Sequence, residues 1–329
     1  MQNLTHDNFV KARDYIFTNT NDNDVNRAWF HYNFEDGDSD KFMDVLAKYQ
    51  HLNGGFGGLS CEFEYQGPCL KSTERAIEYI LELNEKPPND HPVIQKMMKY
   101  ILEQYIPEIG NWGEVVVPEV NDDVHCSWVS YRNEPINPTL DENERIKNYR
   151  ANEKVPFAAF VAYYSDIVPK ELHDEIIKYP TQHIIRYCDE SLPDYKGFFD
   201  VYDFEYFLWL VPCLKDRVLS EKLITILRQN PTAYWELDFT KSDTDYVHLP
   251  CDYGVCSPNN VIYPFVKDMV DEALSYRINQ QCDSGKWPLG WSYGSSEELR
   301  RLEAKADIRR TVNMLVKLKR FGRIEGSIE

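Results

Sequence analysis

The sequence predicts an all-α protein that is built from a stack of helical hairpins. Amphipathic helical stripes recur along the chain, and turns that contain glycine and an aromatic residue separate them. Alternating strand patterns are scarce, and only residues 114–120 would suit one short extended segment. With 329 residues, of which 43% are hydrophobic, the chain is long enough to bury one large core. We expect a single domain over residues 1–329.

The predicted helices follow from apolar residues that recur at steps of three and four, which places them on one helix face. These stripes lie at 42–52, 70–81, 93–105, 219–227, 265–274 and 308–321. Gly67 and Pro68 precede the second stripe as start signals. Gly322 follows the last stripe, where a left-handed helix cap is expected.

The turns between these helices form a loose internal repeat. They lie at 53–58, 109–113, 196–199 and 284–287, with a degenerate copy at 234–235. Each period holds two helices and a loop, and such a hairpin cannot bury its apolar face alone. We therefore expect Phe56, Trp112 and Trp287 to be buried at equivalent positions of successive hairpins. Residues 132–154 interrupt this rhythm with prolines and charged residues, which predicts an exposed insertion.

The composition excludes some classes of partner. A net charge of −18 argues against nucleic acid and anionic lipid, since both require a cationic surface. The first residues contain neither a basic nor an apolar signal region, and no apolar stretch is long enough to span a bilayer. We expect a soluble, cytoplasmic protein whose eight cysteines are mostly free thiols.

One group of residues has ligand types that suit a metal. His248, Cys251 and Cys256 could bind zinc, but a fourth ligand is not apparent and no Cys-x-x-Cys pair occurs. A loop with two buried thiols is the simpler interpretation. We expect no metal and no cofactor, with zinc and magnesium as minor alternatives.

The turns and the helices that follow them resemble the repeats of the terpenoid cyclase and protein prenyltransferase superfamily. The resemblance rests on Gly54-Gly55-Phe56-Gly57-Gly58 with the helix from Lys71, and on Gly285-Lys286-Trp287 with the helix from Ala306. It covers most of the chain from about Asp40 to Phe321, without the insertion. It implies an α/α toroid, in which an inner and an outer ring of helices surround a central cavity. It also implies a small-molecule ligand in that cavity, an isoprenoid.

The catalytic signatures of the superfamily are incomplete in this chain. The Asp-x-Asp-Asp motif of the acid-dependent cyclases aligns with residues 120–123, where the first acid is replaced by Val120. The Asp-Asp-x-x-Asp motif that binds magnesium diphosphate ends here on Cys126. The prenyltransferases bind zinc with an Asp-x-Cys pair, and here Asp123 and Cys126 are one residue too far apart for that pattern. These differences from the three motifs would suit a relative whose catalytic activity has changed.

The densest group of chemically active residues lies at 119–128. Asp122 and Asp123 are adjacent and repel each other, so one of them could keep a proton near neutral pH in a partly dry cavity. His125 would share a helix face with Asp122. We predict Asp122, Asp123 and His125 as catalytic residues in the first turn of an inner helix that faces the cavity. Helix capping by the two acids is the alternative.

Aromatic and acidic residues elsewhere are candidates for substrate binding, because ring faces attract cations and sugars. These candidates are Trp128, Tyr131, Glu64, Tyr65, Asp252 and Tyr253. Glu62, Asp203 and Glu205 are weaker candidates that also lie beside aromatic residues.

Three functions are compatible with the sequence. The first is an enzyme that acts on an isoprenoid in an aromatic-lined cavity, by acid catalysis or by stabilising a cation. The second is a carbohydrate-active toroid, a polysaccharide lyase or glycoside hydrolase, with paired acids and exposed aromatic platforms. The third is a binding scaffold of the same fold without catalysis.

Overall fold

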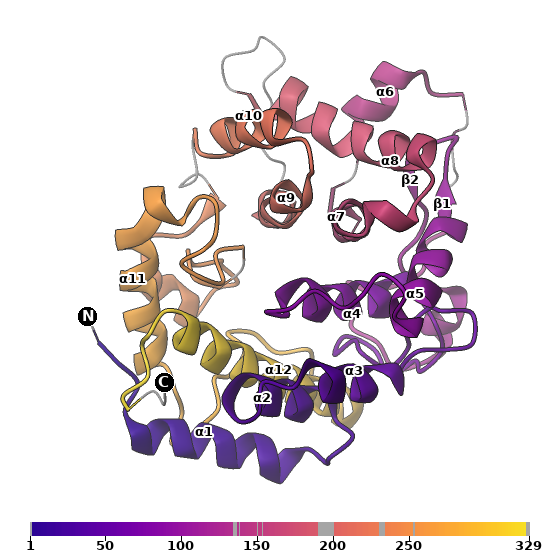
Figure 1. The fold of residues 1–329 in the computed structure, drawn as a ribbon. Helices are drawn as coiled ribbons and strands as arrows, with labels where there is room; N and C mark the ends of the chain where they lie inside the picture. Colours follow the sequence, from indigo (N-terminus) through magenta and orange to yellow (C-terminus); the bar gives the residue numbers. More distant parts are fainter. Residues whose placement is uncertain are drawn as a thin grey trace.

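Helices dominate the structure, a computed structural model that describes residues 2–133, 137, 139–149, 151–152, 154–189, 201–229, 234–252 and 254–326 (Figure 1). The α-helices are α1 (His6–Asn19), α2 (Val25–Phe34), α3 (Ser39–Ala47), α4 (Leu70–Glu82), α5 (Pro92–Glu103), α6 (Glu142–Lys147), α7 (Val155–Tyr163), α8 (Lys170–His183), α9 (Val201–Cys213), α10 (Arg217–Leu227), α11 (Tyr263–Asn279) and α12 (Glu297–Arg320). Short 3₁₀-helices lie at Pro118–Asp122, Ser165–Ile167 and Phe239–Asp243, and a π-helical turn at Ile184–Cys188 follows α8. Within the described residues, the strands β1 (Tyr105–Ile106) and β2 (Asn111–Trp112) form one antiparallel pair. The prediction of an all-α protein is confirmed for this part of the chain.

The helices predicted from apolar stripes are all present, as α3, α4, α5, α10, α11 and α12. Local signals fix several of their ends. The Asp216 side chain accepts a hydrogen bond from Leu219 N (3.0 Å) at the start of α10, and Ser296 accepts one from Leu299 N (3.2 Å) at the start of α12. After α12, Gly322 adopts a φ of 64°, as a left-handed cap requires.

The region after the Trp112 turn differs from the prediction. Residues 114–120 form no strand, and the expected inner helix around Asp122 is absent. Instead, the 3₁₀-helix Pro118–Asp122 ends at an extended Asp123. Pro118 cannot donate a backbone hydrogen bond to a strand ladder, and Lys71 N binds Val115 O (2.7 Å), which ties this segment to the start of α4.

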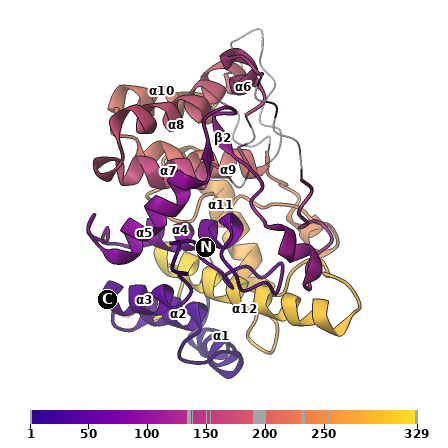
Figure 2. The same ribbon diagram turned by 90° about the vertical axis from the view of Figure 1, so that its right-hand side faces the viewer.

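Inner and outer helices alternate between α4 and α10. In Figure 1, helices α4, α7, α9 and α12 lie toward the middle of the molecule, α5, α8, α10 and α11 lie outside them, and α1, α2 and α3 lie below α12, away from the middle. Helix α4 contacts α7, α7 contacts α9, and α12 contacts α2. The remaining neighbours are joined by side chains: the Trp29 and Tyr79 rings connect α2 to α4 (5.2 Å between centroids), and Lys317 of α12 donates to Asp252 O (2.7 Å) in the segment beyond α9. Figure 2 shows the same helices after a quarter turn.

The first and last Gly-aromatic turns share one set of backbone contacts. In the first, the Gln50 side-chain amide donates to Gly54 O (3.0 Å) and Val93 O (3.0 Å). In the last, the Gln281 amide donates to Gly285 O (2.8 Å) and Asn8 O (2.9 Å). Val93 lies in α5 and Asn8 lies in α1. Helix α1, from the start of the chain, therefore packs on the last turn as α5 packs on the first.

The glycines and aromatic residues of these turns have matching roles. Gly54 and Gly285 have φ of 94° and 91°, and a Cβ on either would collide with a backbone carbonyl, of Lys96 or of Lys11. Phe56, Trp112 and Trp287 are all buried, as predicted. The turn at 196–199 lies outside the described residues.

Most of the described residues at 132–154 are exposed, but part of this segment packs against the body of the protein. Its helix α6 contacts α8, and buried His183 places Nδ1 2.8 Å from Ile146 O. Ile146 and Tyr149 are buried. Apolar residues within the charged segment therefore anchor it to the body of the protein.

In the described part of the chain, no helix combines the length and the apolar character that a bilayer crossing requires. The eight cysteines are free thiols, four of them buried.

Candidate functional site: the central cavity

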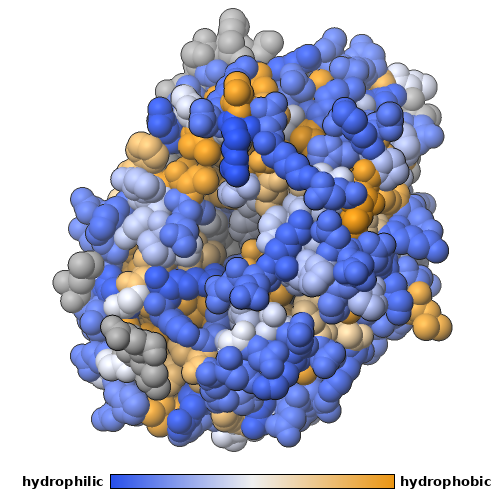
Figure 3. Space-filling view, in the orientation of Figure 1, coloured by the Kyte–Doolittle hydropathy of each residue, from blue (hydrophilic) through white to orange (hydrophobic). Residues whose placement is uncertain are grey.

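A cavity of about 1740 Å³ lies in the middle of the molecule. Helices α4, α9 and α12 supply much of its wall, and loop residues around 111–118, 128–133 and 289–293 supply the rest. The space-filling view shows a hollow near the middle of this face, with hydrophilic residues around much of it (Figure 3). Cationic residues of the wall outnumber acidic ones, although the chain as a whole carries a net charge of −18.

Helix α4 turns a charged stripe toward the cavity. Lys71, Arg75, Glu78 and Glu82 recur at steps of four, three and four residues, so they lie on one helix face. The apolar residues of α4, such as Ile77 and Ile80, are buried on its other side. The charged face therefore points inward, to the cavity, and not to the outer surface.

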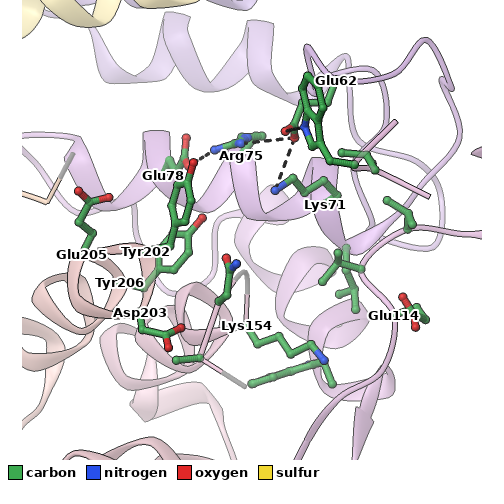
Figure 4. Close-up of a pocket in the computed structure, with 18 of the residues that line it drawn as sticks. Glu62, Lys71, Arg75, Glu78, Glu114, Lys154, Tyr202, Asp203, Glu205 and Tyr206 are labelled. Atoms are coloured by element: carbon green, nitrogen blue, oxygen red, sulfur yellow. Dashed lines mark hydrogen bonds and ion pairs between the residues drawn. The ribbon is translucent and has the colours of Figure 1, made fainter. Parts of the chain in front are cut away.

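Glu62 lies opposite this stripe and is held by its cations (Figure 4). Its Oε2 is 3.6 Å from Lys71 Nζ and 3.8 Å from an Arg75 nitrogen, and Trp128 Nε1 donates to Oε1 (3.1 Å). Burial by itself would raise the pKa of Glu62, but the two cations and the indole lower it to about 2. Glu62 is thus a permanent carboxylate at neutral pH.

The charged cluster around Glu62 continues across the cavity wall. Lys71 also pairs with the fully buried Glu74 (3.4 Å), whose other oxygen accepts a hydrogen bond from Tyr206 of α9 (2.6 Å). Glu78 pairs with both Arg75 and Arg309, which links α4 to α12. The Arg309 ion pair and the Tyr206 hydrogen bond thus join α12 and α9 to α4.

Glu205 of α9 occupies a different environment. Its side chain is 4% exposed, and Oε1 lies 3.5 Å from Nδ1 of the equally buried His248. Burial raises the pKa of Glu205 to about 7, against the lowering effect of His248. Gly254, with a φ of 67°, allows the neighbouring loop to approach Glu205, since a Cβ there would lie 2.9 Å from Glu205 Cγ. A large fraction of this carboxyl is therefore protonated at neutral pH.

Aromatic rings form much of the remaining wall. Trp112, Tyr202, Tyr206 and Trp209 line the interior. Another group meets edge to face: the exposed Trp128 with the buried Tyr293 (5.2 Å between centroids), and Tyr246 with Trp291 (4.4 Å). The cavity thus combines charged groups with electron-rich ring faces.

The predicted catalytic residues do not line this cavity. Asp122 and Asp123 are exposed, and Asp123 Oδ1 accepts a hydrogen bond from Val124 N (2.8 Å). His125 is half-buried, with Nδ1 2.9 Å from Asp123 O. The predicted placement on an inner helix is wrong, because the chain here pairs with residues 62–64 through Cys126 N to Glu62 O (2.8 Å) and does not coil.

The predicted substrate-binding residues divide into two groups. Trp128, Tyr131 and Asp252 line the cavity. Both Asp252 oxygens accept hydrogen bonds from Arg277, and although burial opposes ionisation, the neighbouring cations lower the pKa of Asp252 to about 2. Glu64 lies outside the lining and pairs with Arg301 (3.4 Å), and Tyr65 also lies outside it. Tyr253 lies outside the described residues.

Among the described residues, no group of three or more His, Cys, Asp or Glu side chains is arranged to hold a metal ion. Lys71, Arg75, Glu78 and Arg309 were missed as site residues by the sequence interpretation. Their spacing on α4 and α12 was visible, but charged helical faces are usually solvated.

Comparisons with models of known protein families, with curated proteins and with solved structures find no match to this chain.

Proposed function

We propose that the chain is an α/α toroid of the terpenoid cyclase and protein prenyltransferase type, and that its central cavity is an active site for an isoprenoid substrate. The alternation of inner and outer helices supports the toroid, as do the shared contacts of the first and last turns. In this proposal α1 completes the outer ring beside α12, because it packs on the last turn as α5 packs on the first.

The observation that carries the enzymatic part of the proposal is the buried, partly protonated carboxyl of Glu205 in the cavity wall. A carboxylic acid whose pKa is near the working pH is well matched to proton donation. We assign Glu205 as the general acid that protonates an alkene, in place of the predicted aspartates. Tyr202 and Tyr206, which precede and follow it on α9, would stabilise the resulting cation through their ring faces.

A carbohydrate-active enzyme is the second candidate, and one observation favours it. Glu62 and Glu205 line the same cavity in opposite protonation states, as the base or nucleophile and the acid of a glycoside hydrolase do. The partly exposed rings of Trp128 and Tyr246 would then serve as sugar platforms.

The proposal is tested by incubating the purified protein with squalene, with farnesyl diphosphate, with the isoprenoid carboxylate farnesoate and with a set of oligosaccharides, and analysing the products by mass spectrometry. We expect a cyclised isoprenoid product. Glu205→Gln should lower its rate of formation by about 10²- to 10⁴-fold, the usual contribution of a general acid.

Asp123→Asn is the matched control, because it removes an exposed carboxyl outside the cavity. It should leave the rate unchanged. Loss of activity in Asp123→Asn with retention in Glu205→Gln would contradict the assignment of the acid. Cleavage of an oligosaccharide would favour the second candidate, and ligand binding without turnover would indicate a non-catalytic scaffold.

A further inference from the structure

We propose that Arg310 and Asn313 of α12 form a carboxylate-binding subsite, so that the ligand of the central cavity carries a carboxylate group. This inference rests on the proposed function only in that the cavity binds a ligand; it requires no proton transfer from Glu205.

The cations that α12 presents to the cavity differ in whether they have a protein partner. Arg309 pairs with Glu78, and Arg320 pairs with Glu82 (3.0 Å). Lys317 donates to two backbone carbonyls, of Cys251 and of Asp252 (2.7 Å). Each of these three cations has a protein partner.

Arg310 differs from its neighbours. Across the described part of the chain, its guanidinium makes no hydrogen bond and no ion pair, and its Nε is buried without a partner. Buried donors are almost always satisfied in proteins, and an unsatisfied one near a cavity indicates a group that the cavity is built to receive. The nearest acid does not fill this role: Asp252 is close enough for Arg310 to lower its pKa, but both of its oxygens are already bound by Arg277.

Asn313 adds a second donor beside Arg310. It lies three residues further along α12, so both side chains are on the same helix face, and both line the cavity. The Asn313 amide is exposed and has no protein partner in the described residues. An arginine fork with an adjacent amide matches the two oxygens of a planar carboxylate.

The balance of charge favours a carboxylate over a phosphate. Lys71, Arg75 and Arg309 are neutralised by Glu62, Glu74 and Glu78. Among the described lining cations of α4 and α12, only Arg310 lacks a protein partner, so this part of the wall has one guanidinium to compensate one negative charge. A phosphate monoester carries up to two at neutral pH. A diphosphate would require still more unpaired cations.

The test compares three ligands with the same alkyl chain: decanoate, decanol and decyl phosphate. Their binding is measured by calorimetry at about pH 8, where an ordinary carboxyl group is ionised. We expect decanoate to bind the wild-type protein about tenfold or more tightly than decanol, as charge-assisted hydrogen bonds of usual strength imply. Arg310→Gln should remove this preference, and Asn313→Ala should reduce it.

Arg301→Gln is the matched control, since Arg301 also lies on α12 but outside the cavity lining. It should leave the preference for decanoate intact. Equal binding of decanoate and decanol, no binding of decanoate, or retention of the preference in Arg310→Gln would overturn the proposal. If decyl phosphate binds more tightly than decanoate, the subsite binds a phosphate group and the proposal of a carboxylate is wrong.

Glu205→Gln separates this inference from the proposed function. It should lower turnover by about 10²- to 10⁴-fold and leave decanoate binding unchanged. If the assignment of the acid is wrong, the rate of product formation in Glu205→Gln shows it. If the assignment of the subsite is wrong, the binding of decanoate shows it.

Discussion

Glu62 and Glu205 line the same cavity and are both largely buried, yet their pKa values lie on opposite sides of the ordinary glutamate value, at about 2 and about 7. Burial acts on both in the same direction, because it disfavours the charged carboxylate. The difference comes from the neighbouring cations. Two of them, Lys71 and Arg75, lie one helix turn apart on α4 and both face Glu62. Among the described residues, His248 lies at comparable distance from Glu205 (3.5 Å), and Lys317 adds a smaller lowering effect on its pKa.

This contrast shows that the position of fixed cations, and not depth of burial, decides which carboxyl keeps its proton. One helix face supplies the charges for the first environment. Three separate segments create the second, namely α9, the residues around His248 and the loop at Gly254. Removing a cation should therefore strongly change the stabilisation of the Glu62 carboxylate. A change in pH near neutrality should strongly change the ionisation of Glu205.

The largest expected effect on stability comes from removing a cation of the Glu62 cluster. Lys71→Met keeps the length of a 5% exposed side chain but leaves Glu62 and Glu74 with less compensation. We expect a loss of about 3–5 kcal/mol in the free energy of unfolding, as for other buried ion pairs that lose one partner. Urea denaturation measures it.

Lys41→Met is the control for this change. Lys41 also pairs with two acids, Asp36 and Asp38, but its side chain is 67% exposed. Its loss should lower the free energy of unfolding far less than the loss of Lys71, because solvent screens exposed pairs. Equal losses in the two variants would mean that the cluster around Glu62 is not held by its charges.

The second prediction concerns stability against pH. The pKa of Glu205 is raised in the folded state, from 4.5 to about 7, so folding binds a proton between these values. The stabilisation is complete below about pH 4.5 and is lost as the pH rises through about 7, by up to about 3 kcal/mol. In Glu205→Gln this decline should disappear from unfolding free energies measured between these pH values.

Glu62 should behave in the opposite sense. Its pKa is lowered, so its contribution is complete above about pH 4.5 and is lost as the pH falls toward about 2. Glu62→Gln should therefore change how the free energy of unfolding depends on pH in the acid range. The dependence near neutral pH should stay unchanged. If Glu62→Gln instead flattened the neutral range, the assignment of the two pKa values would have to be exchanged.

The smallest effect is expected from the indole that completes the Glu62 environment. Trp128→Phe removes the hydrogen bond from Nε1 to Glu62 (3.1 Å) and retains most of the ring. Because Trp128 is 44% exposed, water can replace the bond, and we expect a loss of about 1 kcal/mol in unfolding free energy. The carboxyl pKa of Glu62, followed by NMR, should rise.

Trp291→Phe provides the comparison for this variant. Trp291 also lines the cavity, but in the described residues its indole makes no hydrogen bond. Its replacement should leave the pKa of Glu62 unchanged. A shift of similar size in both variants would attribute the effect to the ring environment and not to the hydrogen bond.

The sequence predicted the helices well, because their apolar stripes repeat within single segments. Phe56, Trp112 and Trp287 were likewise recognised as buried, since glycine and a large ring in a turn leave few other arrangements. Site residues were harder to predict. Asp122 and Asp123 are adjacent in the chain and looked like a reactive pair, but the expected helix does not form and they remain exposed.

The sequence by itself determined the helical composition, the repeated turns and the strongly acidic net charge, all of which depend on local patterns or on simple counts. Only the tertiary structure decided which charged helix faces meet inside the molecule. The Lys71–Glu82 stripe of α4 would suit a solvated surface equally well, and it becomes a cavity wall only because α9 and α12 lie across from it. The environment of Glu205 depends on His248 and Gly254, which are more than forty residues away in the chain. Because a pKa is set by all charges and surfaces within a few ångströms, it could not be read from either segment alone.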